Sequence, residues 1–245
     1  MVRRFRGHPD EEWIAWVAAL FAFGGVKQII RSLETALGRL GADPDSAPLV
    51  DRWTKATDET ELAQTLLESL KGFAHRVYVD RDLVMILLLY RRSRLEFGSM
   101  ENHFRHHYRT DDETIERPLS GIVADYRRWS REIEFRPGSF FKHMLNSPEQ
   151  KSVCKRWVMF LKWVIRPDDG IDLGLWSGIR SDQLVIPLDT HLFSISRRLR
   201  LTRKKTANWA TAVEVTRGLK KLDTDDPLKF DFSLCRLGMA KRRTD

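Results

Sequence analysis

The sequence predicts an all-α protein, and three observations support that fold class. Apolar residues recur three and four positions apart in successive segments, which is the spacing of one face of an α-helix. Glycine, proline and short polar clusters separate these segments, as expected at helix ends and turns. Hydrophobic residues make up 42% and charged residues 31% of the 245 positions, which is typical of a globular protein with a substantial core.

The first two helices are indicated by their boundaries. Pro9 and the three acidic residues after it mark a helix start. The segment that follows is apolar on most sides, so we expect a buried helix that ends before Gly24 and Gly25. A second helix is expected over residues 26–40, because Gly41 ends the pattern.

Several helices are expected in the middle of the chain. Residues 51–100 carry leucines at helical spacing and should form two or three helices, with Asp80 and Asp82 as caps of the last one. A polar loop is expected over residues 110–116 up to Pro118, and a further helix over residues 122–135. The sequence Asn-Ser-Pro-Glu at 146–149 predicts a helix restart.

The helix expected over residues 152–166 carries two lysines beside an apolar stripe. Lys155 and Lys162 lie seven residues apart and therefore fall on one side of the helix. A lysine beside an apolar stripe loses solvation, which lowers its pKa and frees its amine for nucleophilic attack. The alternative is that both lysines extend to solvent and cover the neighbouring tryptophans.

The segment 186–201 contains a carboxylate placed directly before an amphipathic run. Pro187 cannot continue a preceding helix, and Asp189 and Thr190 follow it at once. Asp189 is therefore predicted to be the N-cap of a helix, where free amides and the helix dipole keep it ionised. A simple capping role is the alternative to a functional one. Two more helices are expected over residues 209–222 and 230–239, the last packing against the Asp189 helix.

Two clusters invite a metal interpretation, but we expect no metal. His103, His106 and His107 have the spacing of one helix face, yet no acidic or cysteine partner stands at ligand spacing. Asp168, Asp169 and Asp172 also suit an ordinary turn and a helix cap. A metal-dependent nuclease built on these residues remains a distant alternative.

The charge is unevenly distributed along the chain. Residues 151–245 hold 20 Lys and Arg against 11 Asp and Glu, a balance of +9, whereas residues 1–150 have a balance of −1. A basic half of this kind is typical of a phosphate-binding surface. No apolar run approaches the ~20 residues of a membrane helix. The basic N-terminus lacks an apolar signal region, and Cys154 and Cys235 are too few for an iron–sulfur cluster, so a cytoplasmic protein is expected.

Two segments resemble a known enzyme superfamily. PLDTHLFSISRRLRLT resembles the start of the catalytic helix in the helix-hairpin-helix GPD superfamily of DNA glycosylases, and DPLKFDFSLCRLG resembles their closing helix. Nearly the whole chain is also similar to a widespread uncharacterised family, through SVCKRWVMFLKWVIR, DLGLW and IPLDTH. That family is itself similar to the glycosylases, most nearly to the archaeal 8-oxoguanine type.

The resemblance implies two interleaved helical lobes with a cleft between them. One lobe would join residues 1–25 to 184–245, and residues 26–183 would form the other. The implied function is excision of a damaged or modified base, such as an oxidised purine or a hypermodified phage base, with a possible lyase step. The protein would act on duplex DNA as a monomer, without cofactor or metal. The alternative is a non-catalytic nucleic-acid-binding protein on the same scaffold.

The resemblance also implies roles for individual residues. Asp189 would be the catalytic aspartate, and Lys155, 34 residues before it, matches the Schiff-base lysine of the archaeal type, with Lys162 as second choice. The endonuclease-type lysine has no counterpart, because position 171 is isoleucine, which leaves the lyase step open. The implied base-pocket residues are Gly24, Gly25, Val26, Lys27, Gln28 and Trp176. The alternative is a simple helix break at the two glycines and a place in the core for Trp176. The implied DNA contacts include Gly174, Gly178 and His191. The basic run Arg203, Lys204 and Lys205 after the Asp189 helix also suits phosphate contacts, and simple solvation is the alternative for it.

Overall fold

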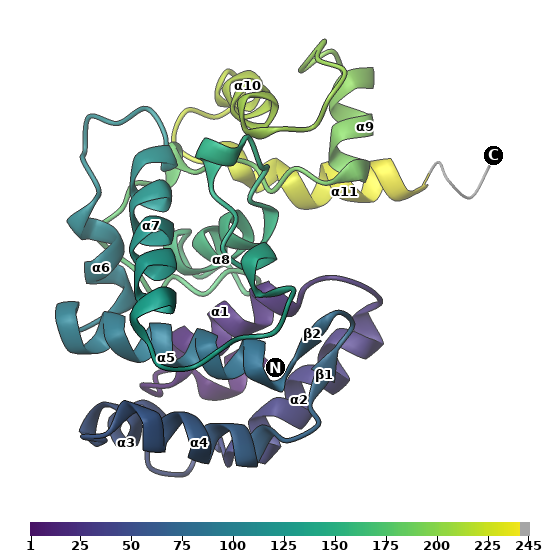
Figure 1. The fold of residues 1–245 in the computed structure, drawn as a ribbon. Coiled ribbons are helices and arrows are strands. Elements are labelled where there is room, and N and C mark those ends of the chain that lie inside the picture. The colour runs from purple at the N-terminus through teal and green to yellow at the C-terminus, as the bar shows by residue number, and fades with distance from the viewer. Residues whose placement is uncertain (241–245) are drawn as a thin grey trace. The chain divides into compact units, whose positions relative to one another are not determined.

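The computed structural model describes residues 1–240, and the side chains of residues 1–237. Within this part of the chain, the α-helices are joined by turns, short 3-10 helices and one two-stranded antiparallel sheet (Figure 1). The predicted all-α class is therefore confirmed. In the same residues, none of the helices combines the length and the apolar character that crossing a membrane requires.

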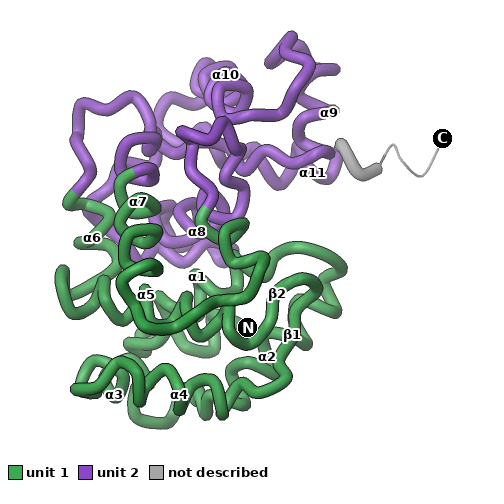
Figure 2. Tube along the Cα trace, viewed as in Figure 1, with its two compact units in different colours: residues 1–106, 121–145 green, residues 107–120, 146–245 purple. Residues whose placement is uncertain are grey.

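The chain divides into two compact units (Figure 2). Unit 1 contains Met1–His106 and Gly121–Leu145, and unit 2 contains His107–Ser120 and Asn146–Asp245. These boundaries differ from those of the two expected lobes, since residues 1–25 belong to unit 1 and not with residues 184–245. The reason is that helix α1 (Glu11–Phe21) is buried and packs against other helices of unit 1, among them the helices directly before and after it in the chain.

Unit 1 is built around α1 and the long helix α5 (Asp80–Phe97). Both are buried over most of their length because nearly every residue of their apolar runs faces another helix. The other helices of the unit are η1 (Val2–Phe5), α2 (Val26–Leu40), α3 (Leu49–Lys55), α4 (Glu59–Leu70), α6 (Met100–His106), most of α7 (Glu116–Glu132) and η2 (Phe141–His143). Strands β1 (Ala74–His75) and β2 (Tyr78–Val79) pair as a short hairpin, which the sequence did not predict.

Acidic residues near the start of α1 cap other helices. Asp10 accepts hydrogen bonds from the amides of Leu49 and Val50, at 2.8 and 2.9 Å, and so caps α3. Glu12 accepts from the amides of Met100 and Glu101 at the start of α6. The sequence pattern explains the acids as first-turn residues of α1, but tertiary contacts use them to satisfy free amides of two distant helices.

Unit 2 contains the second half of the chain. Its helices after the first turn of α7 are η3 (Pro148–Gln150), α8 (Lys155–Ile165), η4 (Ser181–Gln183), α9 (Thr190–Arg198), α10 (Trp209–Lys220), η5 (Pro227–Phe230) and α11 (Asp231–Ala240). Helix α11 packs against α9, as predicted, and α10 lies against η5. The helix expected over residues 152–166 is confirmed as α8, which buries one face.

Two predicted boundaries were wrong. Helix α7 begins at Glu116 and not near residue 122, because Pro118 lies in the first turn, where its missing amide hydrogen costs nothing. The restart predicted at residues 146–149 is the single 3-10 turn η3, capped by Ser147. It ends at Lys151, whose φ of 58° is left-handed and breaks the helical path before α8.

Candidate active site

Asp189 is the N-cap of α9, as predicted. One carboxylate oxygen, Oδ1, accepts hydrogen bonds from the amides of His191 at 3.0 Å and Leu192 at 2.9 Å. The other oxygen, Oδ2, faces the ammonium of Lys155 at 3.0 Å. The carboxylate therefore serves two structural partners at once, and its side chain remains 20% exposed.

Lys155 is the first residue of α8, so two helix starts meet at this ion pair. The first turn of α8 contains no acidic residue. A positive charge at the N-terminal end of a helix is unfavourable, because the amide dipoles there are also positive. Asp189 supplies the compensating negative charge from 34 residues away in the chain. The Lys155 side chain is 35% exposed, which leaves the pair accessible from solvent.

The surroundings of Asp189 keep it ionised. Partial burial favours the neutral acid and by itself would raise the pKa of Asp189. The hydrogen bond from the Leu192 amide and the charge of Lys155 outweigh burial, so the pKa of Asp189 lies below its ordinary value. The group is therefore a carboxylate at neutral pH and can stabilise a positive charge beside it.

Cys235 on α11 lies in the electrostatic environment of the same pair. Burial raises the pKa of its thiol, the negative charge of Asp189 raises it further, and Lys155 opposes both effects. The thiol therefore stays protonated at neutral pH and is no competing nucleophile. The sequence analysis did not connect Cys235 with Asp189, because only the packing of α11 on α9 brings them near each other.

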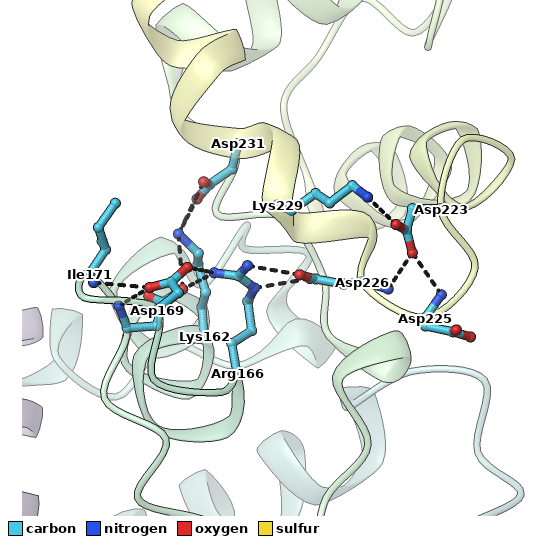
Figure 3. A network of polar contacts seen from close by, with 10 residues as sticks. Lys162, Arg166, Asp169, Ile171, Asp223, Asp225, Asp226, Lys229 and Asp231 are labelled. Atoms are coloured by element: carbon cyan, nitrogen blue, oxygen red, sulfur yellow. Dashed lines mark hydrogen bonds and ion pairs between the residues drawn. The ribbon is translucent and has the colours of Figure 1, made fainter.

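Lys162 takes part in a buried ion-pair network of unit 2 (Figure 3). Its Nζ lies 2.8 Å from Asp231 Oδ2 and 3.7 Å from Asp172 Oδ2, and its side chain is 7% exposed. Arg166, one turn later, forms a bidentate pair with Asp226 and also contacts Asp172. Lys162 thus joins α8 to the start of α11, whereas Lys155, at the partly exposed N-terminal end of α8, faces Asp189.

The segment that contains Gly174 and Gly178, two of the implied DNA contacts, uses several of its backbone amides internally. The amides of Leu173 and Gly174 donate to the carbonyl of Trp163, and the amide of Trp176 donates to that of Val164. Gly174 has a φ of 62°, and a Cβ there would lie 2.8 Å from the nitrogen of Asp168, so the position requires glycine for a tight turn. Gly178 is half-buried in the same segment. The Trp176 side chain is 4% exposed and packs edge-on against Phe160, so it belongs to the core of unit 2.

The other expected base-pocket residues lie in unit 1 at the start of α2. Gly24, Gly25, Lys27 and Gln28 are all exposed, and Val26 is 70% exposed. Gly25 is the N-cap of α2 and provides no side-chain cap, so the first amides of the helix have no such partner. The guanidinium of Arg76 lies 4.5 Å from the centre of the Phe23 ring beside this turn. This is an accessible apolar and cationic edge.

The expected DNA contacts after α9 are exposed, but they are not equivalent. Arg203 and Lys205 are exposed, and among the described residues neither has a carboxylate partner. Lys204 instead donates to the carbonyl of Ala210 at 3.0 Å and pairs with Glu214 at 3.4 Å. His191 is half-buried in the first turn of α9.

The histidine segment contains a carboxylate partner that sequence spacing did not reveal. His103 Nε2 lies 3.2 Å from Asp125 Oδ2, and His103 Nδ1 lies 2.8 Å from the hydroxyl of Ser93. This Ser-His-Asp arrangement has the connections of a hydrolytic triad. However, Ser93 and His103 are both 0% exposed, so no substrate reaches the hydroxyl. The arrangement satisfies buried polar groups in the core of unit 1.

Comparison with known proteins places the chain in a family. A family model described as "Protein of unknown function (DUF2400)" matches residues 1–240. The match covers nearly the whole chain, so the chain belongs to that family. No curated protein and no solved structure gives a significant match.

Proposed function

We propose that this member of the DUF2400 family is a DNA glycosylase, with the Lys155–Asp189 pair at its catalytic centre. The observation that supports the proposal best is an ionised, partly exposed carboxylate with an amine 3.0 Å away. The roles of both residues come from the glycosylase resemblance, and the 3.0 Å contact between them is a separate observation.

The proposed chemistry requires a negative charge beside the sugar. When the bond between C1′ and the base nitrogen breaks, its electron pair leaves with the base and positive charge develops on the sugar. A preorganised carboxylate stabilises that charge in the transition state. Asp189 meets this requirement because its amide hydrogen bonds hold it in place and lower its pKa.

Lys155 is the proposed nucleophile for a lyase step. Its nitrogen would form a bond to C1′ as the base departs, and opening of the sugar would then give an imine. The attack needs the neutral amine, so the ammonium must first lose a proton. Asp189 Oδ2 already accepts a hydrogen bond from that ammonium and is the acceptor at hand. If water attacks instead, Asp189 is the group that orients and deprotonates it.

The substrate class follows from the resemblance and from charge. The basic balance of residues 151–245 suits a polyanion, and these residues include the catalytic pair. A glycosylase must take its target base out of the stack. The proposed target is a damaged or modified base, either an oxidised purine or a hypermodified phage base, excised by a monomer with two interleaved lobes and a cleft between them. The exposed start of α2 is the proposed edge that contacts the extruded base and the space that this base leaves in the duplex.

The second candidate is a non-catalytic nucleic-acid-binding protein on the same scaffold. One observation favours it: Asp189 already has a structural role as a cap, and Lys155 already has one as its ion-pair partner. The nuclease alternative receives less support, because Asp172 and Asp169 both contact Arg166. Nuclease activity that disappears with chelator would revive it.

A panel assay tests the proposal. Duplexes that carry single modified bases, together with modified phage DNA, are incubated with the protein, and released base is measured by mass spectrometry. The expected result is release from at least one substrate, with retention of activity in chelator. The matched control is Asp189→Asn, in which asparagine still caps α9 but carries no charge. Binding without release on every substrate would favour the non-catalytic candidate.

A further inference from the structure

The glycine-containing segment 166–178 is poorly suited to binding phosphate. Three of its amides donate to carbonyls of α8, as described above. Its exposed charged side chains are Asp168 and Asp169, and its one cation, Arg166, is buried and already pairs with Asp169, Asp172 and Asp226, so the segment offers little positive charge to an anion. A protein that binds DNA must therefore contact much of the phosphate backbone elsewhere.

A second surface of unit 2 has the required character. A cavity of about 580 Å³ lies along the C-terminal end of α9 and the loop after it. Its lining combines one aromatic ring, two hydroxyl groups and four guanidinium groups, from Phe193, Ser194, Arg197, Arg198, Arg200, Thr202 and Arg203. We call this cavity the arginine groove. Of these residues, only Arg203 was expected from the sequence to contact DNA.

The guanidinium groups of the arginine groove are not neutralised. Arg198, Arg200 and Arg203 are exposed, and none has a carboxylate partner among the described side chains. Arg197 lies with its guanidinium 5.9 Å from the centre of the Phe193 ring. By contrast, the exposed Arg180 and Arg217 of the same unit pair with Asp182 and Glu113. Four adjacent like charges repel one another, and an anionic ligand removes that cost.

Part of the groove's shape comes from a strained residue. Arg200 has a φ of 59°, a left-handed conformation that is uncommon for a residue other than glycine. It follows the end of α9 and turns the chain so that Thr202 and Arg203 line the same cavity as Arg197. The turn is tied to the helix by the hydrogen bond from the amide of Leu201 to the carbonyl of Ser196.

We propose that the arginine groove, and not the glycine-containing segment, is the main phosphate-binding surface of the protein, and that it binds consecutive phosphates of one DNA strand. Guanidinium groups bind phosphate oxygens in a bidentate manner, and the Phe193 ring offers a flat surface to a sugar or base. The lining of the groove runs from Phe193, about one turn after Asp189, to the loop beyond the C-terminal end of α9, which lies about 13 Å from Asp189. That distance equals the rise of about four nucleotides of a strand. The choice of DNA as ligand rests on the proposed function.

Salt-dependent binding tests the groove separately from catalysis. The probe is an undamaged, fluorescently labelled 20-base-pair duplex, titrated with the full chain at several salt concentrations. Arg198→Ala and Arg203→Ala should each weaken binding about tenfold and reduce the slope of log K against log salt by about one, because each removes a phosphate contact. Lys221→Ala is the matched control, since Lys221 is an exposed cation of the same unit outside the groove.

The outcomes separate this inference from the proposed function. If neither arginine variant reduces the affinity or the slope of log K against log salt more than Lys221→Ala does, the groove is not the main phosphate-binding surface. If they lose both while the wild-type protein releases no base from any duplex, the groove stands and the glycosylase proposal fails. Unchanged melting temperatures would show that the variants are folded, as expected for exposed side chains.

Discussion

Lys155 Nζ and Asp189 Oδ2 lie 3.0 Å apart, and each residue stands at the start of its own helix. The lysine begins α8, and the aspartate caps α9. This arrangement brings an amine and an ionised carboxylate together at the N-terminal ends of two helices.

Replacing Asp189 by asparagine should separate charge from capping. Asparagine caps α9 about as well as aspartate, so the affinity for the duplex probe should change by less than about threefold. Base release should fall by about 10²-fold or more, which is the scale of losing an electrostatic stabiliser of the transition state. The measurement is the single-turnover rate on the substrate found in the panel assay. Retained activity in this variant would refute a catalytic carboxylate.

Borohydride trapping should identify Lys155 as the nucleophile. Reduction of an imine between the lysine and the sugar gives a permanent protein–DNA adduct, visible by electrophoresis. The adduct should be absent in Lys155→Ala and present in Lys151→Ala, which removes an exposed lysine four positions earlier. An adduct that persists in Lys155→Ala would assign the chemistry to another amine. Base release without any adduct would indicate that water is the nucleophile.

The charge of Asp189 should also contribute to stability in a pH-dependent way. Its pKa is lower in the folded protein than in the unfolded chain, where the pKa of an aspartate is about 3.9. Its contribution is therefore fully present above that value and is lost as pH falls through the lower, folded pKa. Urea unfolding of the wild type and Asp189→Asn should show a stability difference at pH 6 that shrinks towards pH 3. A difference that grows on acidification would contradict the depressed pKa.

Removing Lys162 should destabilise the protein strongly. Lys162→Ala leaves Asp231 and Asp172 as buried carboxylates with one cation fewer, and breaking a buried pair costs about 3–5 kcal/mol. Burial already raises the pKa of Asp172, against the opposing charges of Lys162 and Arg166. The free energy of unfolding in urea measures the loss. Lys155→Ala is the control, and its partly exposed ion pair should contribute only about 1 kcal/mol or less.

Asp10→Ala should cost more than the loss of an ordinary helix cap. Asp10 is 1% exposed, and its removal leaves the amides of Leu49 and Val50 buried without partners. We expect a loss of about 2–3 kcal/mol in the free energy of unfolding. Asp58 caps the exposed start of α4, where water replaces the carboxylate, so Asp58→Ala should cost about 1 kcal/mol. Equal losses in the two variants would contradict this difference.

The helices that carry the candidate site were predictable because their signals are local. Helix α2 occupies the predicted residues 26–40, since glycines bound its apolar pattern on both sides. Asp189 was predicted as an N-cap because a short acidic side chain before an amphipathic run satisfies amides two and three positions away. The apolar stripe of α8 likewise indicated which face is buried.

Only the tertiary structure decided which charged groups meet. Lys155 and Lys162 share one helix and one side chain chemistry, yet one faces Asp189 at a partly exposed end and the other faces Asp231, 69 residues away, in the interior. Trp176 entered the core, and the left-handed backbone at Arg200 brought Arg203 to the same cavity as Arg197. Helix periodicity and caps depend on a few neighbouring residues, so the sequence determines them directly. Ion pairs such as Lys155–Asp189 depend on how distant segments pack, because the energy of a charge is set by the partners and the solvent around it.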